Sequence, residues 1–191
     1  MCFVSFASIA FITNVNQTFE PTSSTSVPKL TKEKIAHIEE VNKTKAYFKK
    51  YLMKKYPLYE KHTDLILNSV FKEAEIKNIS PLLIIAVIEV ESSCRFDAIS
   101  NVGALGIMQV YEPRLSQEEA KKLFDPEYNI QKGTEKLSNF LKAKNGNLQL
   151  ALGMYLGAQD ATYNAKIMEL IGRYYVALQT VDKKGVMVAK F

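Results

Sequence analysis

Apolar residues recur at helical spacing along most of this chain, among polar and charged ones. Over residues 31–55 they line one face of a lysine-rich segment, which predicts an amphipathic helix that ends before Pro57. The same period predicts further helices over residues 63–76, 81–92, 117–123, 129–143, 148–158 and 163–180. Alternation typical of a strand is confined to "GVMVAKF" at residues 185–191. The pattern therefore predicts an all-α, mainly helical fold.

The segment "PLLIIAVIEVES", residues 81–92, is apolar on almost every side before its acidic residues. Ser80 suits the N-cap of this helix, and Pro81 suits its first position because a proline has no N–H to leave unpaired there. A helix that is apolar all round is a buried helix. We therefore expect this one at the centre of the fold.

Two glutamates close this helix, and they cannot point the same way. Glu89 and Glu91 are two residues apart, or roughly 200° around the helix axis. Glu91 stands at the C-terminal end among hydrophobic neighbours, so lost hydration and the helix dipole should both raise its pKa. Such a carboxyl suits a general acid, although position alone favours an ordinary helix-end carboxylate. Glu89 is expected to be solvated or paired with a lysine.

The chain opens with an uncharged apolar run at residues 2–12. A helix that spans a bilayer needs about 20 residues, so the run is too short to span but matches the core of a secretory signal peptide. We expect export, to the periplasm or the cell envelope. Because no Lys or Arg precedes the run, an upstream start codon or a short membrane-surface anchor also explains it. "EPTSSTSVP", at residues 20–28, is typical of a linker.

Basic charge is concentrated near the N-terminus. Residues 29–61 hold ten lysines against four glutamates, a net charge of +6 in a chain whose total is +5. Such a segment is attracted to anionic surfaces such as phospholipid head groups, acidic wall polymers and nucleic acid. A solvated, lysine-rich helix face is the simpler interpretation. An anionic envelope surface is therefore a candidate partner, and no nucleic acid is expected.

Composition limits the chemistry further. A chain of 191 residues with 47% hydrophobic and 24% charged content supports one buried core plus an extension. Cys2 and Cys94 do not amount to a disulfide framework, and Cys94 is expected as a small buried hydrophobe. His37 and His62 are the only histidines, so no zinc-type cluster and no cofactor are expected.

A run of small residues follows the helix that carries Glu91. Only 8 of the 191 residues are glycine, yet two of them lie three positions apart here. The constrained positions are, in order, Glu91-Ser92, Ser100, Gly103-Ala104 and Gly106-Ile107-Met108-Gln109. At this spacing the chain resembles the soluble lytic transglycosylase family, whose catalytic domain is similar to goose-type lysozyme. The resemblance covers about residues 60–180 and includes "FDPEYNIQKGTEKLSNFL" downstream.

The resemblance implies a set of site residues, with Glu91 as the catalytic group. It implies substrate contacts from Ser92, Ser100, Gly103, Met108, Gln109, Tyr155 and Tyr175. Gly103 and Gly106 would let the loop turn tightly beside the sugar groove, and Gln109 would hydrogen-bond there. Tyr175 is alternatively a core tyrosine on an amphipathic helix. The expected organisation is a signal-like segment at 1–19, a linker at 20–30, a basic helical arm at 31–57, the catalytic domain at 58–181 and a tail at 182–191.

The chain departs from the family's pattern at several places. Cys94 and Phe96 stand where the family has an aromatic residue and a proline. Leu156 replaces the asparagine of an Ala-Tyr-Asn-Ala-Gly motif, whose tyrosine then corresponds to Tyr155. The stretch "TYNA" at residues 162–165 fits that motif by its letters but lies eight residues too late. We therefore select Tyr155 for the site.

The activity implied is cleavage of the β-1,4 bond between N-acetylmuramic acid and N-acetylglucosamine in peptidoglycan. Glu91 would protonate the leaving oxygen and the substrate's N-acetyl group would stabilise the cation. The ionised Glu91 would then take the C6 hydroxyl proton and close a 1,6-anhydro ring, whereas ordinary glycosidases use two carboxylates. A lysozyme-like hydrolase on the same fold stays open, as does a non-catalytic peptidoglycan-binding assembly module, which Leu156 suggests. Glycan strands are the expected partner, and a monomer is expected.

Overall fold

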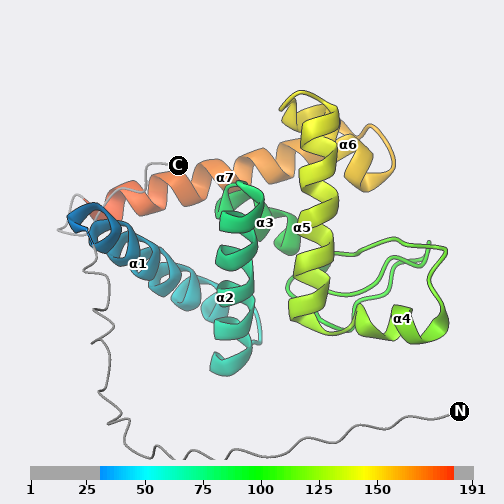
Figure 1. Ribbon diagram of the computed structural model, residues 1–191, viewed down its shortest axis with the longest axis horizontal. Helices are drawn as coiled ribbons and strands as arrows, with labels where there is room; N and C mark the ends of the chain where they lie inside the picture. Colours follow the sequence, from blue (N-terminus) through cyan, green and yellow to red (C-terminus); the bar gives the residue numbers. More distant parts are fainter. Residues whose placement is uncertain (1–30, 183–191) are drawn as a thin grey trace, which may run out of the picture. The chain divides into compact units, whose positions relative to one another are not determined.

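The computed structural model of the chain describes residues 31–182. Seven helices and no strand are found in this part, so the predicted all-α fold is confirmed (Figure 1). The expectations for the signal-like segment at 1–19, the linker at 20–30 and the strand-like pattern at 185–191 lie outside the described residues, as does the tail beyond residue 182.

Each predicted helix is present, with small differences at the ends. The helices are α1 (Lys32–Lys55), α2 (Glu60–Lys77), α3 (Pro81–Ser92), α4 (Gln117–Lys122), α5 (Pro126–Ala143), α6 (Leu148–Leu156) and α7 (Ala161–Asp182). The largest shifts are at α2 and α5, which each begin three residues earlier than predicted. Asp125 is its N-cap and accepts a hydrogen bond from the backbone N–H of Tyr128, with Pro126 in the first turn.

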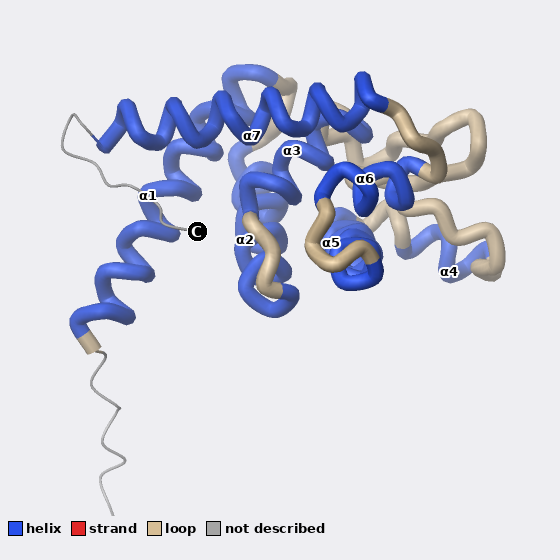
Figure 2. Tube along the Cα trace, turned by 90° about the horizontal axis from the view of Figure 1, so that it is seen from above, coloured by secondary structure: helices blue, strands red, loops and turns tan. Residues whose placement is uncertain are grey.

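Helix α3 forms the centre of the core, as its apolar sequence predicts. Every residue from Pro81 to Glu89 is buried. The helix packs against α2 and α7, and α2 packs in turn against α5 (Figure 2). Ser80 does occupy the N-cap position, but its side chain makes no capping hydrogen bond. At the other end the C-cap residue Ser93 adopts a left-handed conformation, with φ 53°, and the helix ends at Ser92.

The lysine-rich helix α1 belongs to the same compact unit as the helices that follow it. It packs on α2, and its Phe48 and Leu52 are fully buried in the shared core. Three of its lysines bind acceptors on its neighbours: Lys45 binds Asn68, Lys49 binds Glu60 and Asp64, and Lys55 binds Glu89. Part of the basic charge of residues 29–61 is therefore neutralised inside the fold.

A long irregular loop connects α3 to α4 and carries the run of small residues. Two isolated bridges, Ile99 with Leu105 and Leu105 with Val110, fold it back on itself. Gly103, Gly106 and Gln109 take positive φ values, so the chain turns sharply between the bridges. This loop stands directly after Glu91 and forms one wall of the site.

Candidate active site

Glu91 faces a cleft with a volume of about 420 Å³, formed where the end of α3 meets the loop, α5 and the end of α6. The side chains and backbone around it belong to Glu91, Ser100, Val102, Ala104, Gln109, Tyr111, Lys136, Met154, Tyr155, Leu156 and Gly157. Glu91 is the only carboxylate among the described residues that line this cleft. In residues 31–182 no group of three His, Cys, Asp or Glu side chains is arranged to hold a metal ion.

Burial raises the pKa of Glu91 to about 7, because the charged form loses hydration in the cleft wall. The hydroxyl of Tyr163, in the first turn of α7, donates a hydrogen bond of 2.5 Å to Glu91 Oε1. This bond favours the ionised form and so lowers the pKa, but burial has the larger effect. With Oε1 accepting from Tyr163, the acid proton of the neutral carboxyl resides on Oε2.

Asn129 on α5 holds the loop in place. Its side chain is fully buried and accepts a hydrogen bond of 2.8 Å from the backbone N–H of Met108. Its amide donates to the carbonyls of Leu105 and Leu123 at 2.8 and 2.7 Å. Three backbone groups are thus satisfied by one side chain, which fixes the loop next to Glu91. Asn129 lies in the stretch at residues 124–141 that resembles the family, but the sequence alone did not predict this role.

The two glycines of the loop serve different purposes. A Cβ at Gly106 would lie 2.2 Å from the carbonyl oxygen of Leu123 and 2.3 Å from Asn129 Nδ2, so the backbone must pass close to the clip made by Asn129. A Cβ at Gly103 would meet nothing within 4 Å, and that glycine is required only by its φ of 86°. Gly106 therefore permits close packing, and Gly103 permits a turn.

Three of the predicted substrate-binding residues line the cleft with Glu91. Ser100 Oγ accepts from the N–H of Ala104 at 2.9 Å, which shapes the turn around Gly103. Gln109 donates through Nε2 to the carbonyls of Ala98 and Gly106, at 3.0 and 2.9 Å. The Tyr155 hydroxyl donates to the carbonyl of Met108 at 2.8 Å. These residues face the cleft while their hydrogen bonds hold the loop.

Two more predicted residues lie behind the cleft wall. Ser92 is buried and donates through Oγ to the carbonyl of Ile107 at 2.7 Å, which ties α3 to the loop. Met108 is fully buried, and a Cβ on Gly133 of α5 would lie only 2.7 Å from its sulfur. Both residues support the site from the core side and do not line the cleft.

The tyrosines are arranged differently from the expectation. Tyr175 is 53% exposed and does not line the cleft, whereas the preceding Tyr174 is buried and bonds to Glu89. Tyr163, set aside because of its distance along the sequence, is the tyrosine that touches Glu91. Its place follows from the start of α7, where Asp160 Oδ1 accepts from the N–H groups of Thr162 and Tyr163. Asp160 is therefore the residue in the sequence that could have indicated the start of α7, because Asp is a preferred N-cap residue.

Glu89 points away from the cleft, as the helix geometry requires, but it is not solvated. Its side chain is only 1% exposed, and it pairs with Lys55 of α1. The hydroxyl of Tyr56 donates to Glu89 Oε2 at 2.6 Å, and the hydroxyl of Tyr174 donates to Oε1. The expectation of a solvated carboxylate is therefore wrong and the alternative of a lysine partner is correct. Cys94 is buried, as expected.

Residues 68–166 match the family described as the transglycosylase SLT domain, which is just over half of the chain. The chain belongs to this family. Its members are lysozyme-like proteins that act on peptidoglycan, in agreement with the resemblance seen in the motif from Glu91 to Gln109. The matched region contains the whole cleft and Tyr163, but α1 and most of α7 lie outside it.

Proposed function

We propose that this protein is a peptidoglycan lytic transglycosylase, which cleaves the β-1,4 bond between N-acetylmuramic acid and N-acetylglucosamine. The observation that carries the proposal is that the cleft offers one carboxyl, Glu91, with a pKa raised to about 7. A general acid must hold its proton near neutral pH. Glycosidases that act through water or a covalent enzyme intermediate use a second carboxylate, for which the described cleft lining has no candidate.

The proposed reaction runs through the two ionisation states of Glu91. The proton on Oε2 passes to the glycosidic oxygen as the bond to C1 breaks, and the substrate's own N-acetyl group stabilises the positive charge at C1. Glu91, now a carboxylate, accepts the proton of the C6 hydroxyl while O6 bonds to C1. The product is a 1,6-anhydro ring, no water is consumed, and Glu91 is protonated again. Between these steps Tyr163 donates to the ionised carboxylate.

The ends of the released fragments test the proposal. Purified wall digested by the full chain should yield 1,6-anhydro ends, which are lighter than reducing ends by one water, in mass spectra of the fragments. Glu91→Gln, analysed beside it, should release none while it keeps its fold. Reducing ends in place of anhydro ends would show a hydrolase on this fold and would overturn the proposal.

A non-catalytic role is the second candidate, and one residue favours it. Leu156 stands in the cleft lining where the family motif has an asparagine. A chain that binds wall material but releases no fragment under any condition tested would be a binding module of an assembly. The retention of Glu91 with its raised pKa and its Tyr163 partner speaks for turnover.

We also propose that the protein is exported and works in the periplasm or cell envelope, where its substrate lies. The support is the apolar run at residues 2–12. In the part of the chain that the structure describes, no helix has the length and apolar character needed to cross a membrane. Exposed lysines of α1, such as Lys43, Lys50 and Lys54, would add attraction to anionic envelope polymers. Cell fractionation with and without residues 1–19 tests the location, and an unchanged distribution would contradict it.

A further inference from the structure

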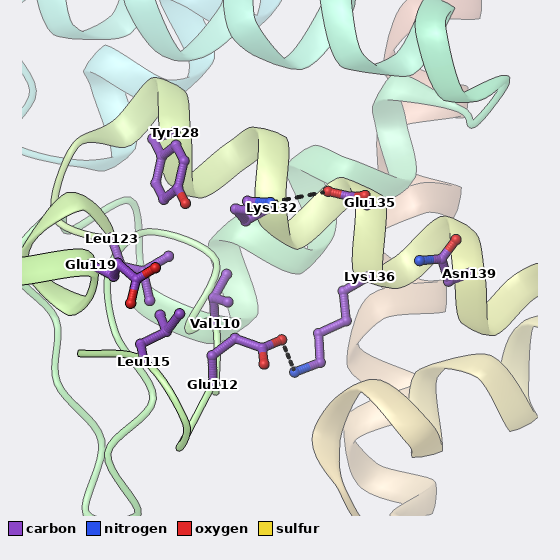
Figure 3. Close-up of a pocket in the computed structure, with 10 residues that line it drawn as sticks. All are labelled: Val110, Glu112, Leu115, Glu119, Leu123, Tyr128, Lys132, Glu135, Lys136 and Asn139. Carbon is purple, nitrogen blue, oxygen red and sulfur yellow. Dashed lines mark hydrogen bonds and ion pairs between the residues drawn. The ribbon is translucent and has the colours of Figure 1, made fainter.

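The segment 109–112, at the end of the loop, has a hollow on either side. Gln109 and Tyr111 line the cleft, whereas Val110 and Glu112 line a second cavity, of about 400 Å³, between the loop, α4 and α5 (Figure 3). Val110 is buried, but Tyr111 is 46% exposed. Close packing therefore does not by itself hold the outer half of this segment.

Hydrogen bonds from within the loop hold the first half of the segment. Gln109 donates through Nε2 to two carbonyls of the loop, and Val110 and Leu105 exchange backbone hydrogen bonds of 2.9 and 3.1 Å. Among the described residues outside the loop, only Lys136 of α5 bonds to residues 110–112. The outer half of the segment is thus tied to the rest of the fold by one side chain.

Lys136 bonds to the segment at two points. Its ammonium group donates to the carbonyl of Tyr111 at 2.5 Å and pairs with the carboxylate of Glu112 at 3.3 Å, the second contact being drawn in Figure 3. The Lys136 side chain is 23% exposed, so water screens its contacts less than it screens the neighbouring pair of Lys132 and Glu135, which are 44% exposed. Contacts to two adjacent residues fix the course of the backbone, and with it the direction of the side chain between them and the cleft.

The side chain that this contact directs is an aromatic ring at the cleft. Of the two tyrosines in the cleft lining, Tyr155 is tied to the Met108 carbonyl, whereas the Tyr111 hydroxyl makes no hydrogen bond to any described residue. A β-linked amino sugar carries its polar groups around its edge and C–H groups on its faces. The face of an aromatic ring is negative and apolar, so it packs well on such C–H groups.

We propose that Lys136 is a positioning residue for glycan binding, which acts by holding the Tyr111 ring against a sugar of the bound strand. The proposal rests on the proposed function, because it requires a glycan strand in the cleft. Without the ammonium group the outer half of the segment loses its tie to α5, the ring is no longer held in one place, and the strand binds more weakly. The acid itself is unaffected, since burial and Tyr163 set the pKa of Glu91 and Lys136 is not among the causes.

Binding of a short glycan tests the proposal without turnover. The probe is tri-N-acetylchitotriose, a β-1,4-linked trimer of N-acetylglucosamine, titrated into the isotope-labelled Glu91→Gln chain and followed by NMR. Lys136→Met removes the ammonium group and Tyr111→Leu removes the ring, and each should weaken binding about five-fold, the loss of one ring face from the contact. Because Lys136 acts through the ring, the two changes together should also weaken binding about five-fold. Losses that multiply to about 25-fold would overturn the proposal.

Further variants separate this role from a general loss of fold. Lys136→Arg keeps charged donors at this place and should bind within about two-fold of the parent chain. The matched control Lys132→Met, one turn earlier on α5 and outside the cleft, should bind as the parent does. In free Lys136→Met the amide signals of residues 109–112 should move while those of α3 stay; unmoved signals at 109–112, or an equal loss in Lys132→Met, would overturn the proposal. If the α3 signals collapse, Glu112→Gln removes one of the two contacts and should weaken binding by less, and unchanged binding would then contradict the role.

Turnover separates this proposal from the proposed function. On purified peptidoglycan, Lys136→Met should raise KM about five-fold, keep kcat within about two-fold and keep the midpoint of the pH profile. A shifted midpoint would mean that the ammonium group acts on Glu91, and would overturn the positioning role. Trimer binding that depends on Lys136 and Tyr111, in a chain that releases no fragments, would refute the transglycosylase and leave the positioning role standing. Fragment release with a KM that Lys136→Met does not change would do the reverse.

Discussion

The acid proton of Glu91 depends on two opposed contacts, and the balance between them sets the pH range of activity. Burial raises the pKa to about 7 and the Tyr163 hydrogen bond lowers it. Because the reaction starts from the protonated carboxyl, fragment release should fall as pH rises through about 7. Initial rates on purified wall, measured at constant ionic strength across that range, give the midpoint. A rate that stays level from weakly acid to alkaline pH would contradict Glu91 as the acid.

Tyr163→Phe should move this midpoint upward, since the hydrogen bond that lowers the pKa is lost while burial remains. The maximal rate should also fall in part, because the ionised carboxylate loses its donor. Tyr155→Phe is the matched control. Its hydroxyl bonds to the Met108 carbonyl, not to Glu91, so its midpoint should stay where the wild type has it. A shift in the control and none in Tyr163→Phe would reverse the roles given to the two tyrosines.

The same carboxyl predicts a change in stability that needs no substrate. The folded pKa of about 7 exceeds the ordinary value of 4.5, so the folded state binds the proton more tightly than the unfolded state. Proton binding by Glu91 therefore stabilises the folded state fully below about pH 4.5, and this stabilisation is lost as pH rises through about 7. Glu91→Gln removes that loss and should be more stable than the wild type at pH 8, by up to about 3 kcal/mol. In thermal melts, the melting temperature of Glu91→Gln relative to the wild type should be higher at about pH 8 than at about pH 4. A variant that is less stable than the wild type at pH 8 would refute the burial of charge at this position.

The loop glycines form a second matched pair. Gly103→Ala should cost about 1–2 kcal/mol, the strain of a left-handed conformation, because its Cβ has free space. Gly106→Ala should cost about 3–5 kcal/mol, because the same strain is joined by a clash with the Leu123 carbonyl and Asn129. Urea unfolding of both variants measures the difference. Equal losses would mean that close packing at Gly106 has no part in holding the loop.

At the scale of elements, the regular period of apolar residues predicted all seven helices, and α3 was correctly placed at the centre. The helix ends were predicted less accurately, because they depend on single capping residues such as Asp125 before α5.

The site was predicted in part. Motif spacing correctly placed Ser100, Gln109 and Tyr155 at the cleft. Tyr163 was missed because its contact with Glu91 spans 72 residues and depends on how α7 returns over α3, which no local pattern encodes.

The buried carboxylate of Glu89 ties three helices together, and its effect should be on stability alone. It accepts from Lys55 and Tyr56 on one side and from Tyr174 on the other. Glu89→Gln leaves the Lys55 ammonium without its counter-charge and presents an amide N–H₂ to hydroxyl donors, so a loss of about 3 kcal/mol is expected. Fragment release at low temperature should persist, since Glu89 does not reach the cleft.

Glu60→Gln supplies the comparison for that variant. It also removes a carboxylate partner of an α1 lysine, Lys49, but the Glu60 side chain is 69% exposed and Lys49 keeps Asp64, so the loss of stability should be much smaller than for Glu89→Gln. Denaturant curves for the two variants measure both values. If Glu89→Gln abolished release at temperatures where it remains folded, Glu89 would belong to the chemistry.

At the scale of the whole molecule, the family match and the folded unit have different limits. The match begins at residue 68, yet the compact unit includes α1. Phe48 of α1 packs edge-on against Tyr174 of α7 at 5.0 Å, and both are buried. Without α1, the apolar faces of α2 and α7 would be open to water and the Glu89 carboxylate would lose Lys55 and Tyr56. Helix α1 thus completes the core behind the helix that carries Glu91.

A chain that starts at residue 58 should therefore fail to fold cooperatively, whereas one that starts at residue 29 should melt as the full chain does. The reason is the burial of Phe48 and Leu52, two large side chains whose removal from a core costs several kcal/mol each, against a total stability of about 5–15 kcal/mol. Circular dichroism melts and wall digestion by both truncations measure fold and activity together. A cooperative and active chain from residue 58 would instead make α1 a separable basic arm, and the attraction of its lysines to anionic polymers would then be its main contribution.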